Sequence, residues 1–288
     1  MGAGMKLYIL DCGQIWTEEG FLWHFGRQAD TGKEYQAAPY GIRNCQFFID
    51  HPKAKIVFDL GFTLEMFSKL VGFPHRKGPE GVHVKQAPDQ NPIAQLAKIG
   101  VKPEDVDYVV ISHLMSEHAG YLPRFAGTKA KIVVQEDEQE YASRIGVPPR
   151  PGDEPAVEQF QSWMYVRELF EVSGLDFMYI KGDHELVGKD VELLSLPGHT
   201  PGFQNMMVRL PKTGPVFLSA CEHRGMYYDI PVNGYAPGIP HAFTWSAAGE
   251  LHSFKRVRDL VEKEEGQIFF GHDQEQFATL KAAPGYYE

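Results

Sequence analysis

The sequence of 288 residues has no cluster of basic residues and no long apolar run. Its formal net charge is -10, so it lacks the clustered cations that bind nucleic acid. No stretch approaches the roughly 20 apolar residues that cross a bilayer, and the first residues do not have the composition of a signal peptide. We therefore expect a cytoplasmic protein that acts on a small molecule, with neither a nucleic acid nor a membrane as partner.

Cysteine is also scarce, and sequence repeats and low-complexity segments are absent. Cys12, Cys45 and Cys221 are odd in number and far apart, unlike the cysteines of a disulfide framework or of a CxxC metal motif. Unpaired thiols are typical of a reducing compartment. The hydrophobic content of 43% is enough for one large core, so we expect a single domain over residues 1–288.

Short runs rich in Val, Ile, Leu and Phe recur along the chain. Such runs, bounded by turn residues, predict strands at 6–10, 45–50, 55–58, 108–112, 131–134, 191–196, 205–210, 216–219 and 267–270.

Helical patterns lie between these runs. Asn91 is a suitable N-cap, Pro92 suits the first helical position, and Gly100 ends the pattern. Apolar residues at helical spacing predict further helices over 153–172 and over 251–261. The mixture predicts an α/β fold in which helices pack on the outside of two sheets.

Two long segments, 15–41 and 227–240, are rich in glycine, proline and aromatic residues. Long loops in a compact domain commonly line a binding cleft, so we expect the first segment to be an insertion that faces the substrate. Its aromatic residues include Trp16, Phe21 and Trp23. The alternative is that these aromatic residues pack in the core or in an oligomer interface.

Several potential metal ligands come at, or soon after, the end of an apolar strand. A lone histidine at such a place is usually structural, but side chains from several strand ends converge on one point and can bind a cation. The candidates with this position are His113, Glu117, His118, His199, Cys221 and His272. Together they predict a site for a divalent transition metal.

Six segments, in this order, resemble the metallo-β-lactamase superfamily, and within it the branch of N-acyl-homoserine lactonases and pyridoxolactonase. They are KLYILDCG at 6–13, FDLGF at 58–62, SHLMSEHAGYL at 112–122, AKIVVQEDEQEYA at 130–142, LPGHTPGFQ at 196–204 and FFGHDQEQF at 269–277. The resemblance covers almost the whole chain. It implies a hydrolase with an αββα sandwich, in which two mixed β-sheets are flanked by helices and a metal site lies at one edge of the sheets.

The metal loop departs from the family pattern, because it reads HxMxEH where the family has HxHxDH. The resemblance places the first metal at the positions of His113, Met115 and His199. A neutral thioether is a poor ligand for a divalent ion, so this first site is expected to be impaired.

The second metal position keeps a full set of candidate ligands. The resemblance assigns it to Glu117, His118 and His272, with either Cys221 or Glu222 at the place of the family's later carboxylate. A thiolate favours zinc, whereas a carboxylate also admits manganese or iron. We expect one metal ion per chain, with zinc as the first choice. The adjacent His223 is either a substitute ligand or a solvated loop histidine.

A metal site of this kind predicts hydrolysis by metal-activated water. Glu117 is the candidate general base. The lactonase branch has a tyrosine that supports the substrate carbonyl, and Arg224, Tyr227 or Tyr228 is the nearest candidate here. The substrate is expected to be a small, apolar or aromatic ester or lactone. The residues predicted to line its pocket are Trp16, Phe21, Trp23, Phe62, Phe67 and Met115.

Two alternatives follow from the altered loop. One is hydrolysis of an activated aryl ether, whose better leaving group needs less help from a second metal. The other is a non-catalytic protein that serves as a partner subunit of an active relative. The resemblance is compatible with a homodimer, because many relatives are dimers, and the second alternative is compatible with a hetero-oligomer with a related subunit.

Overall fold

The computed structural model describes residues 4–18, 39–65, 83–145, 164–227, 240–241 and 244–288. The part of the chain up to residue 180 forms a seven-stranded sheet. Its order is β4-β1-β2-β3-β5-β6-β7. The strands are β1 (Lys6–Glu18), β2 (Pro39–His51), β3 (Ala54–Phe58), β4 (His83–Lys85), β5 (Tyr108–Val110), β6 (Lys131–Gln135) and β7 (Asp176–Ile180). β4, β1, β2 and β3 pair antiparallel, and β3, β5, β6 and β7 pair parallel.

The C-terminal half forms a five-stranded sheet with the order β12-β11-β10-β9-β8. Its strands are β8 (His184–Lys189), β9 (Val191–Ser195), β10 (Gln204–Leu210), β11 (Gly214–Ser219) and β12 (Gln267–Phe270). Only β11 and β12 pair in parallel in this sheet as described, so both sheets are mixed.

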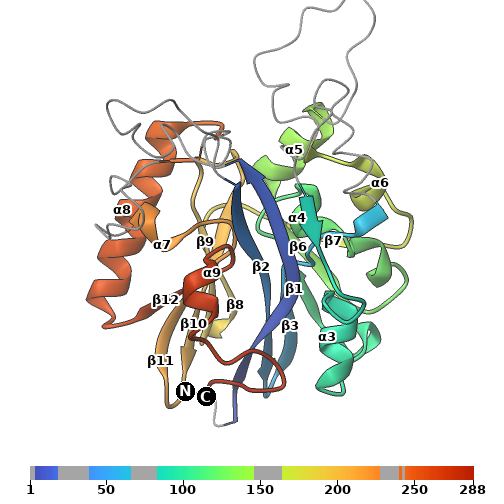
Figure 1. Cartoon of the computed structure of the whole chain (residues 1–288), viewed down its shortest axis with the longest axis horizontal. Helices are drawn as coiled ribbons and strands as arrows, with labels where there is room; N and C mark the ends of the chain where they lie inside the picture. The colour runs from blue at the N-terminus through green and yellow to red at the C-terminus, as the bar shows by residue number, and fades with distance from the viewer. Residues whose placement is uncertain (1–3, 19–38, 66–82, 146–163, 228–239, 242–243) are drawn as a thin grey trace, which may run out of the picture.

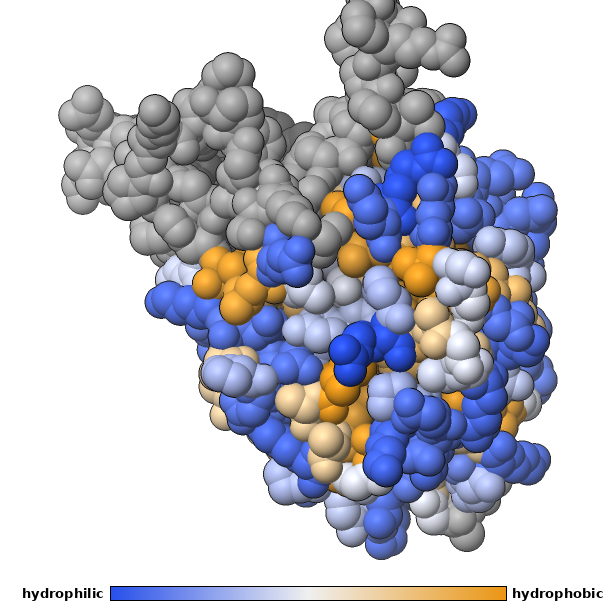
Figure 2. All heavy atoms as spheres, turned by 90° about the vertical axis from the view of Figure 1, so that its right-hand side faces the viewer, coloured by the Kyte–Doolittle hydropathy of each residue, from blue (hydrophilic) through white to orange (hydrophobic). Residues whose placement is uncertain are grey.

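Helices cover the outer faces of the two stacked sheets (Figure 1). They are α3 (Pro92–Lys98), α4 (Ser116–Ala119), α5 (Glu136–Ile145), α6 (Arg167–Phe170), α7 (Arg224–Tyr227), α8 (Ala247–Lys263) and α9 (Gln274–Phe277). Helices α3 to α6 lie on the side of the seven-stranded sheet and α8 on the side of the other. The face that carries α3 to α6 is mostly hydrophilic, with apolar residues in small patches (Figure 2). The predicted αββα sandwich is confirmed.

The residues of β1 show why these strands lie inside the molecule. Leu7 and Ile9 pack in the cluster between the sheets, whereas Tyr8 and Leu10 pack in a second cluster beneath the helices of the seven-stranded sheet. Successive side chains of a strand point to opposite faces, so a strand that is apolar at every position is buried on both sides.

All nine predicted strands are present, and three further strands of the described residues, β4, β7 and β8, were not predicted. Of these, β4 has three residues, and β8 has only half-buried and exposed residues, so neither has a strong hydrophobic pattern. The segment 15–41 is not a loop throughout, since β1 and β2 continue into it and Trp16 pairs with Gly41. Residues 19–38 lie outside the described residues.

The helix predictions were correct in part. The Asn91 side chain accepts a hydrogen bond from the amide of Ala94 at 2.9 Å and caps α3, as predicted. The helix predicted over 251–261 is α8, but Leu251 is 42% exposed and does not share its buried face. Of the helix predicted over 153–172, only α6 is helical within the described residues, while α5 was not predicted. No described helix is long and apolar enough to cross a membrane.

Candidate metal centre

Segments that follow strands of both sheets bring the predicted ligands together. His113 comes after β5, and His118 lies in α4 a few residues later. His199 lies in the turn between β9 and β10, and Cys221 and His272 lie two residues beyond β11 and β12. None of these side chains is more than 3% exposed.

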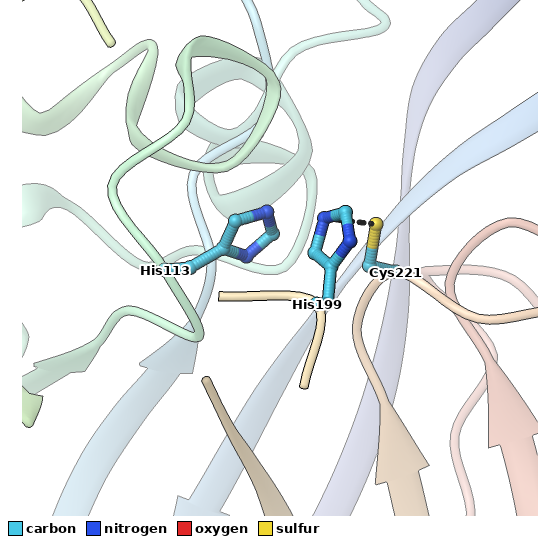
Figure 3. A group of neighbouring side chains, drawn as sticks. All are labelled: His113, His199 and Cys221. Atoms are coloured by element: carbon cyan, nitrogen blue, oxygen red, sulfur yellow. Dashed lines mark hydrogen bonds between the residues drawn. The ribbon is translucent and has the colours of Figure 1, made fainter. Parts of the chain in front are cut away.

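Three overlapping groups of possible ligands share this centre, and the ligand atoms of each group lie within 4.8 Å of one another. They are His113, His199 and Cys221; His118, Cys221 and His272; and His113, Glu117 and His118. Cys221 belongs to two of the groups. It lies with His113 and His199 in one, and with His118 and His272 in the other. Figure 3 shows the first group, in which His199 lies between His113 and Cys221. The Nε2 atom of His199 is 3.5 Å from the Cys221 Sγ atom.

The protein holds one ring nitrogen of each of three histidines. Asp59 lies 2.8 Å from Nδ1 of His118, and the Arg43 carbonyl accepts a hydrogen bond from Nδ1 of His272 at 2.8 Å. The Ser112 hydroxyl lies 2.9 Å from Nδ1 of His113. The Nε2 atoms of His113 and His118 are buried and have no hydrogen-bond partner among the described residues. A buried polar atom without a partner is costly, so these two atoms fit a bound metal ion.

Three of the four histidines are in the neutral form that a metal requires. Burial, reinforced by repulsion between the rings, lowers the pKa of His113 and His199 well below the usual value and that of His272 to about 3. Burial also lowers the pKa of His118, but the charge and hydrogen bond of Asp59 outweigh it, so the net shift is upward. Metals bind neutral imidazole, and most of this set is neutral at pH 7.

Burial shifts the pKa values of the acidic candidates in the centre upward. Burial raises the pKa of the Glu117 carboxyl. It raises the pKa of the Cys221 thiol well above the usual value, and the nearby carboxylate of Glu117 adds to the effect. A bound cation favours the ionised form of both groups, so the chemistry of this donor set also fits a metal.

Asp59 has an unusual backbone conformation, with φ of 62°. Its side chain accepts hydrogen bonds from the amide and from the hydroxyl of Ser112, each at 2.7 Å, in addition to its contact with His118. Strained backbone of this kind persists when several contacts fix it. One carboxylate thus joins the end of β3 to the metal loop.

The turn that carries His199 is clamped between two helices. A Cβ atom at Gly198 would collide with Glu250 of α8, and one at Gly202 would collide with Glu138 of α5. The backbone of both helices therefore approaches the turn as closely as glycine allows. The carbonyl of His199 accepts a hydrogen bond from the amide of Trp245, at 2.9 Å, which fixes the turn on the α8 side.

Glu222, one of the two alternatives for the later ligand, is buried but belongs to none of the three groups. Its carboxylate accepts hydrogen bonds from Asn205 at 3.1 and 3.2 Å, from Ser219, and from the hydroxyl of Tyr227 at 3.1 Å. The structure thus brings Cys221 to the histidines and leaves Glu222 in a separate network.

The two described candidates for the carbonyl donor contact residues that are next to candidate ligands in the sequence. Nε of Arg224 is 3.2 Å from Asp273, and the guanidinium also pairs with Glu275. Tyr227 is 1% exposed and donates its hydroxyl to Glu222. His223 is not a solvated loop histidine, because it is 4% exposed and its Nε2 lies 3.4 Å from Asp273. Tyr228 lies outside the described residues.

The residues predicted to line the substrate pocket differ in their surroundings. Phe62 and Met115 are fully buried in hydrophobic clusters. Trp16 is partly exposed near the end of β1, and the Lys85 ammonium lies 4.5 Å from its ring centroid. Phe21, Trp23 and Phe67 lie outside the described residues.

Four buried side chains that support the centre were not predicted. Asp59 and Glu138 fall within the quoted motifs, but only the fold shows what they contact. His241 lies at the end of a segment rich in glycine and proline, and its Nε2 is 3.1 Å from the carbonyl oxygen of Cys221. Its Nδ1 pairs with Glu250, and these two residues form a fourth group with His199. Burial of an acidic residue in the first turn of a helix has no clear signal in the sequence.

Comparison with solved structures places this architecture in one class. An N-acyl homoserine lactone hydrolase, solved with N-hexanoyl-L-homoserine at its catalytic metal centre, matches with a TM-score of 0.74 and 24% identity over 98% of both chains. AidC, a dizinc quorum-quenching lactonase, matches with a TM-score of 0.63 and 14% identity over 99% of this chain and 94% of that chain. The fold is that of the hydrolases of the metallo-β-lactamase superfamily.

Sequence comparison narrows the class to a family, although no family model matches the chain. The N-acyl homoserine lactonase AttM of Azorhizobium caulinodans is 32% identical over 292 residues, which cover 99% of each chain. The chain therefore belongs to the N-acyl homoserine lactonase family of the metallo-β-lactamase superfamily. The resemblance seen in the sequence is confirmed at the level of the family.

Proposed function

We propose that this protein is a metal-dependent lactone hydrolase. The observation that carries the proposal is the buried centre of histidines, Glu117 and Cys221, in which Nδ1 of His113, His118 and His272 is held by the protein. The relatives with the same fold include enzymes that open the ring of N-acyl homoserine lactones.

The metal is proposed to be zinc, held by His118, His272 and Cys221 with Glu117 beside it. The first three residues form a group within 4.8 Å, and a set of imidazole and thiolate ligands is typical of zinc. Manganese and iron remain alternatives that the experiment must include. When bound, the ion would lower the pKa of a water molecule and polarise the ester carbonyl.

Glu117 is proposed to orient the attacking water and to accept its proton. The carboxylate lies within 4.8 Å of the ring nitrogens of His113 and His118 in the group that they form. Its backbone carbonyl accepts a hydrogen bond from Asn44 at 3.2 Å, so the start of α4 is tied to β2. A carboxylate held beside the reacting water is suited to general base catalysis.

Of the two described candidates for the carbonyl donor, Arg224 is better placed than Tyr227. Its side chain is 25% exposed, and it adjoins the loop of His272 through Asp273. We expect Arg224→Ala to lower kcat more than KM rises, because a donor that strengthens in the transition state acts on kcat. Full activity in Arg224→Lys, with a loss in Arg224→Ala, would point to the ion pair with Asp273 instead, because lysine keeps the charge but not the planar guanidinium.

The substrate is proposed to carry an apolar or aromatic group. The support is Trp16, which lies two residues along β1 from Gln14 and donates a hydrogen bond to it at 3.3 Å. Gln14 donates to Gln274, two residues beyond His272, at 2.6 Å. The exposed part of the indole thus borders the end of the sheet that carries the centre, where an apolar group would find a partner.

A panel of substrates tests the proposal directly. Protein loaded in turn with zinc, manganese or iron would be assayed on lactones with short, long and aromatic acyl groups, on aryl esters and on activated aryl ethers. We expect ring opening of lactones, with kcat/KM rising with apolar acyl length. Turnover of aryl ethers but not of lactones would show that the substrates are activated aryl ethers instead. No turnover with any metal would favour the non-catalytic subunit.

Metal content tests the number of ions. Elemental analysis of protein purified without added metal should find about one transition-metal ion per chain. Two ions per chain would show that His113 and His199 hold a second ion despite Met115. Size measurement in solution would decide between a monomer, a homodimer and a hetero-oligomer.

A further inference from the structure

Glu138 is a fully buried carboxylate in the first turn of α5, outside the groups of possible ligands found in the described part of the chain. Its Oε1 atom accepts a hydrogen bond from the amide of Leu114 at 2.9 Å, and its Oε2 atom accepts one from the hydroxyl of Thr200 at 2.5 Å. Each donor is the immediate neighbour of a candidate ligand, His113 in one loop and His199 in the other. One side chain therefore joins two loops that are far apart in the sequence.

The other contacts of Glu138 strengthen the same link. The amide of Gly202 also donates to the carboxylate, and α5 lies so close to Gly202 that a Cβ atom there would collide with the Glu138 backbone. The hydroxyl of Tyr165 donates to Oε1 at 2.8 Å. A buried carboxylate with several donors is stable only in this one place, since every displacement leaves a donor or an acceptor without a partner.

The two histidines lie close together in the two loops that Glu138 joins. The ring centroids of His113 and His199 are 4.9 Å apart and the rings are nearly perpendicular, at 80°. Hydrogen bonds of the described residues join each imidazole to a different neighbour, His113 to Ser112 and His199 to Cys221, so the positions of the two loops determine how far apart the rings lie. Glu138 is the side chain in the described structure that accepts hydrogen bonds from both loops.

We propose that Glu138 is a positioning residue that sets the spacing of His113 and His199. Through His199, whose Nε2 atom lies 3.5 Å from Sγ of Cys221, it also positions a proposed ligand of the zinc ion. The inference rests on the proposed metal site. The inference goes beyond the proposed function because it gives a role to a residue outside the groups of possible ligands. Residues that orient metal ligands typically contribute about 10-fold to 100-fold to metal affinity.

Glu138→Gln tests the role with little change of volume. A glutamine offers one acceptor oxygen instead of two, so at least one donor from the two loops loses its partner. Competition with a chelator should show cobalt and zinc dissociation constants raised about 10-fold to 100-fold. The visible spectrum of the cobalt-loaded protein should also change, because that spectrum reports the geometry of the ligands.

A matched pair of variants separates positioning from general stability. Thr200→Val and Tyr165→Phe each remove one hydroxyl that donates to the same carboxylate, but only Thr200 adjoins a candidate ligand. We expect Thr200→Val to weaken metal binding and to alter the cobalt spectrum. Tyr165→Phe should lower the melting temperature of the metal-free protein while the dissociation constant changes by less than about threefold.

The outcomes distinguish this inference from the proposed function. If wild-type protein binds metal and hydrolyses lactones, but Thr200→Val and Glu138→Gln keep its dissociation constants and cobalt spectrum, the positioning role is wrong and the function stands. Equal effects of Thr200→Val and Tyr165→Phe on metal binding would also overturn it. Wild-type protein that binds no divalent metal would refute both. Thr200→Val keeps the test open if Glu138→Gln does not fold.

Discussion

The two halves of the candidate metal centre are held in different ways. His118 and His272 have separate anchors, the Asp59 carboxylate and the Arg43 carbonyl. His113 and His199 lie in two loops that are joined through Glu138. The comparison teaches that loss of one anchor should disturb mainly one histidine in the first case and two in the second.

The thiol of Cys221 is common to both halves, so its loss should have the largest effect. Cys221→Ser replaces a thiolate by a hydroxyl, which stays protonated and is a weak ligand. We expect metal affinity to fall by at least about 100-fold, more than for a residue that only orients a ligand. Elemental analysis after dialysis would measure the loss.

Glu222→Gln is the matched control for Cys221→Ser, because Glu222 is the adjacent residue and is equally buried. It should lower stability through its network with Asn205 and Tyr227, yet retain the metal content of each folded chain. The reverse pattern, with metal retained in Cys221→Ser and lost in Glu222→Gln, would identify Glu222 as the ligand.

Asp59→Asn should affect mainly the half with His118, because Asp59 contacts His118 directly and reaches His113 only through Ser112. The amide cannot carry the charge that faces Nδ1 of His118, so metal affinity should fall about 10-fold to 100-fold. The cobalt spectrum should change in a different way from that of Glu138→Gln, since a different histidine is released. Identical spectra for the two variants would mean that the halves do not act separately.

Met115→His tests whether an added imidazole restores the metal position of His113 and His199. Met115 is fully buried at the N-cap of α4, between His113 and His118. An imidazole there restores the family pattern, and we expect the metal content to rise from about one ion per chain toward two. Met115→Leu keeps the volume without a ligand and should leave the content unchanged. No difference between the two variants would count against a first site that is otherwise intact.

Tyr227→Phe should have the smallest effect, because the hydroxyl contacts neither half. It removes the hydrogen bond to Glu222 and should cost about 1 kcal/mol of unfolding free energy. We expect kcat/KM on the best lactone to stay within about threefold of wild type. A larger loss of kcat at unchanged stability would return Tyr227 to the role of carbonyl donor.

The fold was predictable because its core strands carry strong local signals. Residues 6–10 are apolar at nearly every position and form part of β1, which is buried on both faces. β8 was missed because its side chains are half-buried or exposed, and a sheet edge needs no apolar run. Leu251 was misplaced because spacing alone does not say where the buried face of a helix ends.

The candidate centre was predictable only in its residue types. Histidines that follow strands could be found in the sequence, but the choice between Cys221 and Glu222 depends on where each side chain points. The carboxylate of Glu222 accepts hydrogen bonds from Asn205 and Tyr227. These contacts follow from the pairing of β10 with β11 and from the packing of α7. Contacts between residues so far apart leave no pattern in a single sequence.

The sequence by itself determined the class of fold and the supply of metal-binding side chains, because periodicity and strand ends are local properties. It also determined that the metal loop carries Met115 in place of an imidazole. Only the tertiary structure decided which groups meet. Cys221 lies with both halves of the histidines, and Glu138 joins two of their loops. The physical reason is that buried polar groups must find partners, and those partners come from whichever segments the packing of two sheets brings together.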